Sequence, residues 1–216
     1  MKYAYSDECS VLGIKLFSGN TTYNHPIQVD DSNYFDMIIH GTNRRDILIM
    51  DNFYAQTKEY AFYLKTHIRA IQQSIIDYNP FNHRYETNND LFIHVRLGDL
   101  LDIQKNDGRK CYHSLEYYDK ICSKLSFDTG YIASDSIDHE ICQTLIQKYN
   151  LKVYNEHEVT TIQFGSTCKH IVLSPGTFSW IIGVFGFYSN VYYSMKNIDN
   201  WHGDIFVFPD WNVVEF

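Results

Sequence analysis

Three polar side chains gather at the end of one apolar segment of this chain. Leu91–Val95 has the composition of a buried strand, and His94, Arg96 and Asp99 lie within it or just beyond it. Ligands of α/β sheets bind at the carboxyl ends of the strands. An Arg held there is permanently charged and donates two parallel hydrogen bonds, which suits phosphate. The alternative interpretation is an ordinary strand end with one surface ion pair.

A carboxylate follows the next expected strand. Asp135 comes directly after the segment 130–133, within Ser134-Asp135-Ser136. At a strand end, a carboxylate can accept hydrogen bonds from ribose hydroxyls or from the edge of a base. The alternative is an N-cap for the helix that follows.

Hydroxyl groups follow a third expected strand, at 170–173. Ser174, Thr177 and Ser179 stand where an apolar helix begins. Backbone N–H groups at a helix N-terminus, with nearby hydroxyls, form an anion site. We therefore predict phosphate binding at this segment, with simple helix capping as the alternative.

The elements that position these residues alternate along the chain. Strands are expected at 91–95, 130–133, 151–154, 170–173 and 191–193, and helices at 114–125, 138–149, 159–165 and 177–187. Such alternation predicts an α/β fold with a parallel, doubly wound sheet. Ser114 is the expected N-cap of the first of these helices.

The first part of the chain has a different pattern. A helix is expected at 56–78, where apolar residues recur near 3.6-residue spacing, and Asn79-Pro80 ends it. Short strands are expected at 11–16, 35–40 and 47–50. The polar stretch 82–90 resembles a linker, so we divide the chain into residues 1–85 and 86–216.

Composition limits the classes of function. The chain has 216 residues, 44% of them hydrophobic, and a formal net charge of −8. A general nucleic-acid or anionic-membrane surface is therefore not expected. No apolar run approaches 18 residues, so no transmembrane segment is expected. Five scattered cysteines without a C-x-x-C pair favour free thiols in a reducing, cytoplasmic compartment.

Several well-known motifs are missing from the sequence. It contains no P-loop, no G-x-G-x-x-G, no G-x-S-x-G and no H-E-x-x-H. Asp135 and Asp138 form only a stretched acidic pair, which is weak as a metal site. Arg96 and a helix N-terminus remain the expected source of positive charge for an anion.

Ordered motifs resemble one known family. The segment His94-Val95-Arg96-Leu97-Gly98-Asp99 resembles the H-x-R-R-G-D motif of the α-1,2-fucosyltransferases, glycosyltransferase family 11, with Leu97 at the second Arg. Segments similar to further family motifs follow in order at 111–118, 131–136, 170–180 and 209–211, with a looser one at 51–56. The resemblance covers roughly residues 50–212. The Gly-rich N-terminal segment of the family has no clear counterpart.

This resemblance implies a B-type glycosyltransferase with one Rossmann-like nucleotide-binding domain, residues 86–216, and a reduced acceptor-side region, residues 1–85. It implies an inverting, metal-independent enzyme that moves fucose from GDP-fucose, its donor substrate, to a glycan hydroxyl. No separate cofactor is expected. The alternatives are a transferase for another nucleotide sugar and a non-catalytic remnant that binds a sugar or nucleotide.

The resemblance also assigns roles to the candidate residues. Arg96 would stabilise charge on the leaving phosphate, and Asp99, or else Asp102, would accept the proton of the acceptor hydroxyl. The expected donor-binding residues are His94, Arg96, Asp135, Ser174, Thr177, Phe178 and Ser179.

Overall fold

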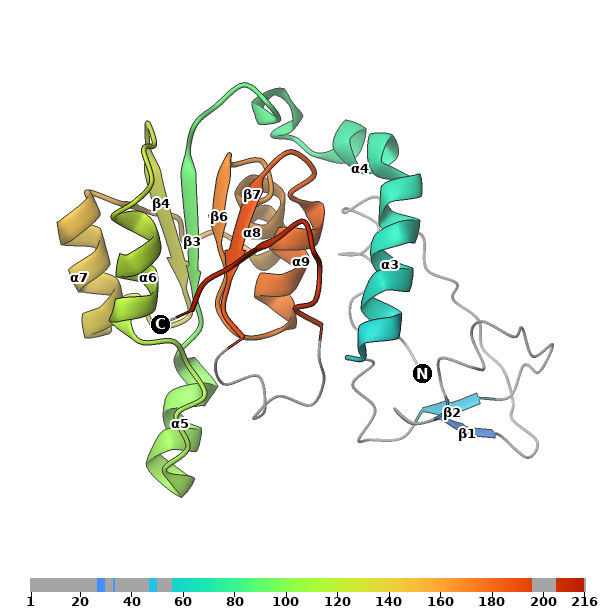
Figure 1. The fold of residues 1–216 in the computed structure, drawn as a ribbon, viewed down its shortest axis with the longest axis horizontal. Helices are drawn as coiled ribbons and strands as arrows, with labels where there is room; N and C mark the ends of the chain where they lie inside the picture. Colours follow the sequence, from blue (N-terminus) through green and yellow to red (C-terminus); the bar gives the residue numbers. More distant parts are fainter. Residues whose placement is uncertain (1–26, 30–32, 34–46, 50–55, 196–204, 216) are drawn as a thin grey trace.

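The computed structural model describes residues 27–29, 33, 47–49, 56–195 and 205–215 (Figure 1). Its centre is a six-stranded sheet in which every neighbouring pair is parallel. The strands are β3 (Leu91–Val95), β4 (Gly130–Ser134), β5 (Lys152–Val153), β6 (His170–Val172), β7 (Asn190–Tyr193) and β8 (Asn212–Val213).

The strand order places a crevice in the middle of the sheet. In space the strands run β5-β4-β3-β6-β7-β8, which is the doubly wound order 3-2-1-4-5-6. The chain moves outward from β3 to β5 and returns to the other side of β3 with β6. Ligands of such sheets bind at this switch point, beyond the carboxyl ends of the strands. The predicted parallel α/β sheet is confirmed, and the topology is compatible with a Rossmann-like domain.

Helices cover both faces of the sheet (Figure 1). One face carries α6 (Leu115–Cys122) and α7 (Glu140–Tyr149), and the other carries α8 (Glu158–Gly165) and α9 (Thr177–Phe185).

The pleat of β3 distributes its side chains between the two cores. Ile93 and Val95 belong to the α6–α7 core, whereas Phe92 belongs to the α8–α9 core. Since side chains alternate along a strand, His94 shares a face with Phe92 and reaches the α8–α9 side.

The expected helix at 56–78 is present but interrupted. It consists of α3 (Lys58–Ala70) and α4 (Gln72–Tyr78), separated at Ile71, whose φ of −111° departs from helical geometry. The helix α3 contacts α9. A short parallel pair, β1 (Ile27–Val29) with β2 (Ile47–Ile49), confirms the strand expected near 47–50. The strands expected at 11–16 and 35–40 lie outside the described residues.

Two elements within residues 86–216 were not predicted. A loop was expected after β3, but the structure has the helix α5 (Gly98–Asp107), which ends at the left-handed Gly108. The short edge strand β8 was also missed. Ser114 precedes α6 as predicted, although its side chain makes no capping hydrogen bond.

The polar stretch before β3 is tied to the sheet domain. It contains the 3-10 helix η1 (Asn82–Arg84). Arg84 forms an ion pair of 2.6 Å with Asp90, in which the side chains are only 17% and 10% exposed. The guanidinium carbon of Arg84 also lies 4.5 Å from the ring centroid of Phe164 in α8. The polar residues of this stretch therefore make tertiary contacts, and the division at residue 85 stays a prediction.

The structure describes four of the five cysteines. Cys111, Cys122, Cys142 and Cys168 are buried and unpaired with one another, and Cys9 lies outside the described residues.

Among the described helices, none is long and apolar enough to cross a membrane.

We predict that Arg84→Met lowers the free energy of unfolding by about 2–4 kcal/mol, because it leaves the Asp90 carboxylate shielded from water without its cation. Urea denaturation followed by circular dichroism measures this change. Arg109→Met is the matched control, since Arg109 pairs with Asp107 at the exposed end of α5, and its denaturation midpoint should not move. Equal midpoints for the two variants would contradict the role given to Arg84.

Candidate functional site

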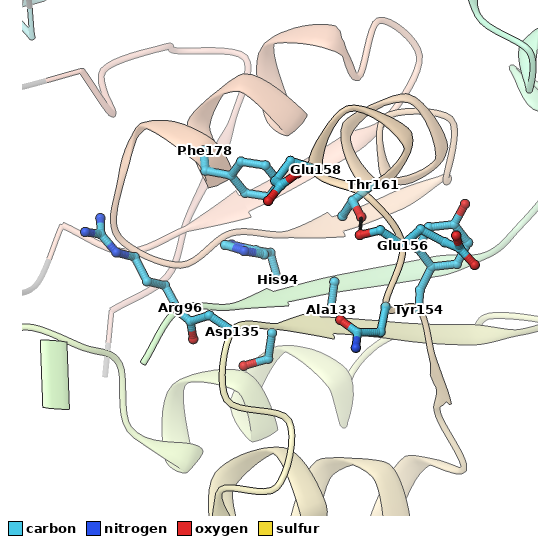
Figure 2. Close-up of a pocket in the computed structure, with 11 residues that line it drawn as sticks. His94, Arg96, Ala133, Asp135, Tyr154, Glu156, Glu158, Thr161 and Phe178 are labelled. Carbon is cyan, nitrogen blue, oxygen red and sulfur yellow. Dashed lines mark hydrogen bonds between the residues drawn. The ribbon is translucent and has the colours of Figure 1, made fainter. Parts of the chain in front are cut away.

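A cavity of about 290 Å³ opens beyond the carboxyl ends of β3, β4 and β5 (Figure 2). It is lined by His94, Arg96, Ala133, Ser134, Asp135, Tyr154, Asn155, Glu156, Glu158, Thr161 and Phe178. Four predicted site residues, His94, Arg96, Asp135 and Phe178, meet in this lining. Ligand pockets usually measure about 300–1,000 Å³, so the enclosed part suits a group of nucleoside size.

Arg96 carries positive charge to the switch point. Its Nε and Nη2 donate to the two carboxylate oxygens of Asp99, at 3.1 and 2.7 Å. Its Nη1 lies so close to Gly176 that a Cβ at this position would collide with it, and the φ of 117° at Gly176 also favours glycine. Gly176 is the residue before α9. The guanidinium and the positive end of the helix therefore lie side by side, as an anion site requires.

The buried hydroxyls of Ser174 and Ser179 connect the end of β3, the loop after β6 and the first turn of α9 by hydrogen bonds. The Ser174 Oγ lies 2.9 Å from Nδ1 of His94 and accepts the backbone N–H of Arg96 at 3.2 Å. The Ser179 Oγ accepts the backbone N–H of Ser174 at 2.8 Å. Both serines are almost completely buried, so this geometry favours a positioning role for their hydroxyls. Thr177 is exposed at the first turn of α9.

Asp135 caps a helix, though not the one that follows it. Its Oδ1 accepts the backbone N–H groups of Leu97 and Gly98, at 2.9 and 3.0 Å, where α5 begins. The next helix, α7, is instead capped by His139. A Cβ at Gly98 would lie 2.8 Å from Oδ2 of Asp135, so glycine permits this close approach.

His94 is a neutral, buried group of the cavity wall. Burial is the main reason that its pKa falls from 6.5 to about 4, and the nearby Arg96 lowers it further, whereas Asp135 opposes the shift. Its ring centroid lies 5.0 Å from that of Phe178 in α9. The neutral imidazole can therefore exchange a hydrogen bond with Ser174 without adding charge to the cavity.

One wall of the cavity was missed from the sequence. Tyr154, Glu156, Glu158 and Thr161 come from the end of β5 and the start of α8. The available signal was Tyr154-Asn155-Glu156, which follows an expected strand as Asp135 does. By contrast, Asp99, Ser174, Thr177 and Ser179 do not line the enclosed part. No cluster of His, Cys, Asp and Glu suited to a metal ion occurs among the residues that the structure describes.

Comparison with known proteins gives one match. The family model for glycosyl transferase family 11 matches residues 29–212, which includes strands β3 to β7, the first residue of β8 and the cavity. No curated protein and no solved structure matches the chain.

The depressed pKa of His94 predicts a pH-dependent stability. The unfolded histidine binds a proton near pH 6.5, whereas the folded one binds it only near pH 4. Between these pH values the unfolded state binds more protons than the folded state, so the free energy of unfolding decreases as the pH falls from 6.5 to about 4. Above pH 6.5 His94 is neutral in both states and does not make the stability depend on pH. At about 1.4 kcal/mol per pH unit, the loss reaches about 3 kcal/mol.

Urea denaturation at a series of pH values measures this effect. His94→Gln should flatten the acid limb of the stability curve, whereas His83→Gln, at an exposed position, should leave the limb unchanged. An unaltered limb in His94→Gln would show that other groups control the acid sensitivity.

Proposed function

The chain belongs to glycosyltransferase family 11, a family of fucosyltransferases, and we propose that it transfers fucose from GDP-fucose to a glycan hydroxyl. The observation that carries this proposal is the position of Arg96, beside the N-terminus of α9 at the switch point of the sheet. A nucleoside diphosphate bound at that point would have its phosphates against a guanidinium and free backbone amides.

The cavity supports the orientation of the donor. Its enclosed part extends from Arg96 toward the ends of β4 and β5 (Figure 2). In doubly wound sheets the phosphates lie at the first strand and the nucleoside over the second and third. We therefore place the diphosphate at Arg96 and Thr177, and guanosine between Asp135 and Tyr154. The acceptor would be bound with the help of residues 1–85, which the resemblance assigns to the reduced acceptor side of a B-type glycosyltransferase.

The proposed reaction is a single inverting displacement. The acceptor oxygen forms a bond to C1 of fucose as the bond from C1 to the β-phosphate oxygen breaks, and GDP leaves with the bonding electron pair. Negative charge grows on the β-phosphate, where Arg96 and the α9 N-terminus stabilise it. The proton of the acceptor hydroxyl passes to the Asp99 carboxylate.

The ion pair between Arg96 and Asp99 fits this scheme. Both carboxylate oxygens of Asp99 accept hydrogen bonds from Arg96, and Asp99 is exposed whereas Arg96 is largely enclosed. An incoming diphosphate competes with Asp99 for the same guanidinium donors. Donor binding would therefore release the carboxylate that the acceptor needs as a base.

The replacement of the second motif Arg by Leu97 leaves the cavity intact. Leu97 is fully buried with Val95 and Leu100 in the core on the α6–α7 side, and it does not line the cavity. The departure at this position therefore changes a core residue and not a residue of the cavity lining.

We also propose that the reaction needs no metal ion and takes place in a reducing, cytoplasmic compartment. Arg96 can supply the charge that a divalent cation supplies in other transferases. The four described cysteines, buried and without a disulfide, support the reducing compartment.

We predict that Arg96→Ala lowers the turnover number by about 10²–10³, because one preorganised donor to a developing anion contributes about 3–4 kcal/mol. Arg96→Lys should recover little, since an ammonium group lacks the planar fork. Release of GDP from GDP-fucose, with and without a glycan acceptor, measures this loss. Arg109→Ala, just beyond the C-terminal end of α5, is the control for the removal of one positive charge. Near-normal turnover in both Arg96 variants would remove Arg96 from the mechanism.

We predict that transfer continues at an unchanged rate after dialysis against EDTA. The same GDP-release assay tests this, with a magnesium-treated sample as the reference. A loss of activity that manganese or magnesium restores would contradict the proposal, and it would direct attention to Asp135 and Asp138 as ligands.

A further inference from the structure

The cavity is lined by one cation, Arg96, and by three carboxylates, Asp135, Glu156 and Glu158. Arg96 stands at one end, and Tyr154 and Glu156 stand at the other, with His94 and Ala133 between them (Figure 2). A ligand that fits this arrangement is anionic at one end and rich in hydrogen-bond donors at the other. The diphosphate of the proposed donor accounts for Arg96 at the first end. No role has yet been given to the carboxylate of Glu156 at the second end.

The Glu156 carboxylate is available for a ligand. Within the described part of the chain, no hydrogen bond or ion pair engages it. Glu158, the other glutamate of this wall, lies 3.3 Å from Nε2 of His157. Burial, followed by the negative charge of Glu156, raises the pKa of Tyr154 to about 12, so the carboxylate acts on the far end of the cavity.

The backbone around Glu156 is held in place. Its carbonyl oxygen accepts the Thr161 hydroxyl at 3.2 Å, which links the loop to the first turns of α8. Tyr154 stacks on Phe164, with ring centroids 4.1 Å apart and an interplanar angle of 9°. The backbone of Glu156 is thus fixed between two anchored positions, and its exposed side chain extends from this loop.

We propose that Glu156 selects the base of the donor by accepting hydrogen bonds from the N1–H and the 2-amino group of guanine, which rests on the proposed use of a GDP-sugar. An ionised carboxylate only accepts hydrogen bonds, through two oxygens. Guanine presents two adjacent donors on this edge. Adenine presents an acceptor nitrogen there, and uracil places carbonyl oxygens on both sides of its single N–H. The acceptor atoms of adenine or uracil would lie against the carboxylate oxygens and repel them. Glu156 would therefore favour guanine by attraction and disfavour the other two bases by repulsion.

Isothermal titration with GDP and inosine 5′-diphosphate tests this role, because the two ligands differ only in the 2-amino group. The wild-type protein should bind GDP about tenfold more tightly, the value of one hydrogen bond to a charged group. In Glu156→Gln this ratio should fall to about one, and GDP itself should bind about 10–100-fold more weakly. Glu140→Gln, at an exposed position in the first turn of α7, should keep the wild-type ratio.

The outcomes separate this inference from the proposed function. If the wild-type protein binds no GDP, the proposed function fails. If it binds GDP, the inference is overturned by equal affinity for the two ligands in the wild type, or by a wild-type ratio in Glu156→Gln. It is also overturned if the ratio collapses in Glu158→Gln and not in Glu156→Gln. Binding of inosine diphosphate by Glu156→Gln shows that this variant is folded.

Discussion

The candidate site depends on one buried hydroxyl, that of Ser174, which links the end of β3 to the loop after the neighbouring strand β6. The Ser174 hydroxyl, in the loop after β6, contacts the His94 ring and accepts the backbone N–H of Arg96 at the end of β3. The backbone N–H of Ser174 donates to the hydroxyl of Ser179 in α9. A buried hydroxyl must be paired, so this network has few alternative arrangements. It sets the distance between β3 and α9, and with it the position of Arg96 against Gly176.

A protein with a net charge of −8 needs local structure to hold an anion. The structure concentrates positive potential at one point, where Arg96 meets the start of α9. Asp99 occupies the guanidinium fork there. Exposed ion pairs contribute little to stability, so exchange of Asp99 for a diphosphate costs little. The ion pair with Asp99 can therefore orient the Arg96 side chain in the free protein and still be replaced by hydrogen bonds from Arg96 to a ligand.

The strands and the strand-end residues were predictable, whereas contacts between distant segments were not. Apolar runs marked β3, β4 and β6, and the rule for strand ends brought His94, Arg96 and Asp135 to one cavity. The helix α5 was missed because it has no regular apolar stripe and its cap, Asp135, lies 37 residues away from Gly98. The role of the Ser179 hydroxyl could not be predicted either, because a hydroxyl at the start of a helix can bind a ligand or a neighbouring backbone amide. Here it accepts the backbone N–H of Ser174. Glu156 was overlooked although the strand before it was expected, at 151–154, and β5 is present there.

Two of the helices that begin next to the cavity, α5 and α9, differ in whether their N-termini are occupied. At α5 the Asp135 carboxylate accepts the N–H groups of Leu97 and Gly98, so this terminus already holds an anion. At α9 the N-cap residue is Gly176, which supplies no side-chain cap. An N-terminus without a cap retains unsatisfied N–H groups and attracts an external anion. Because Asp135 fills the one terminus and Arg96 stands beside the other, the proposed diphosphate would bind at α9. Under the proposed function, Asp135 would therefore influence donor placement in two ways, by capping α5 and by lining the cavity.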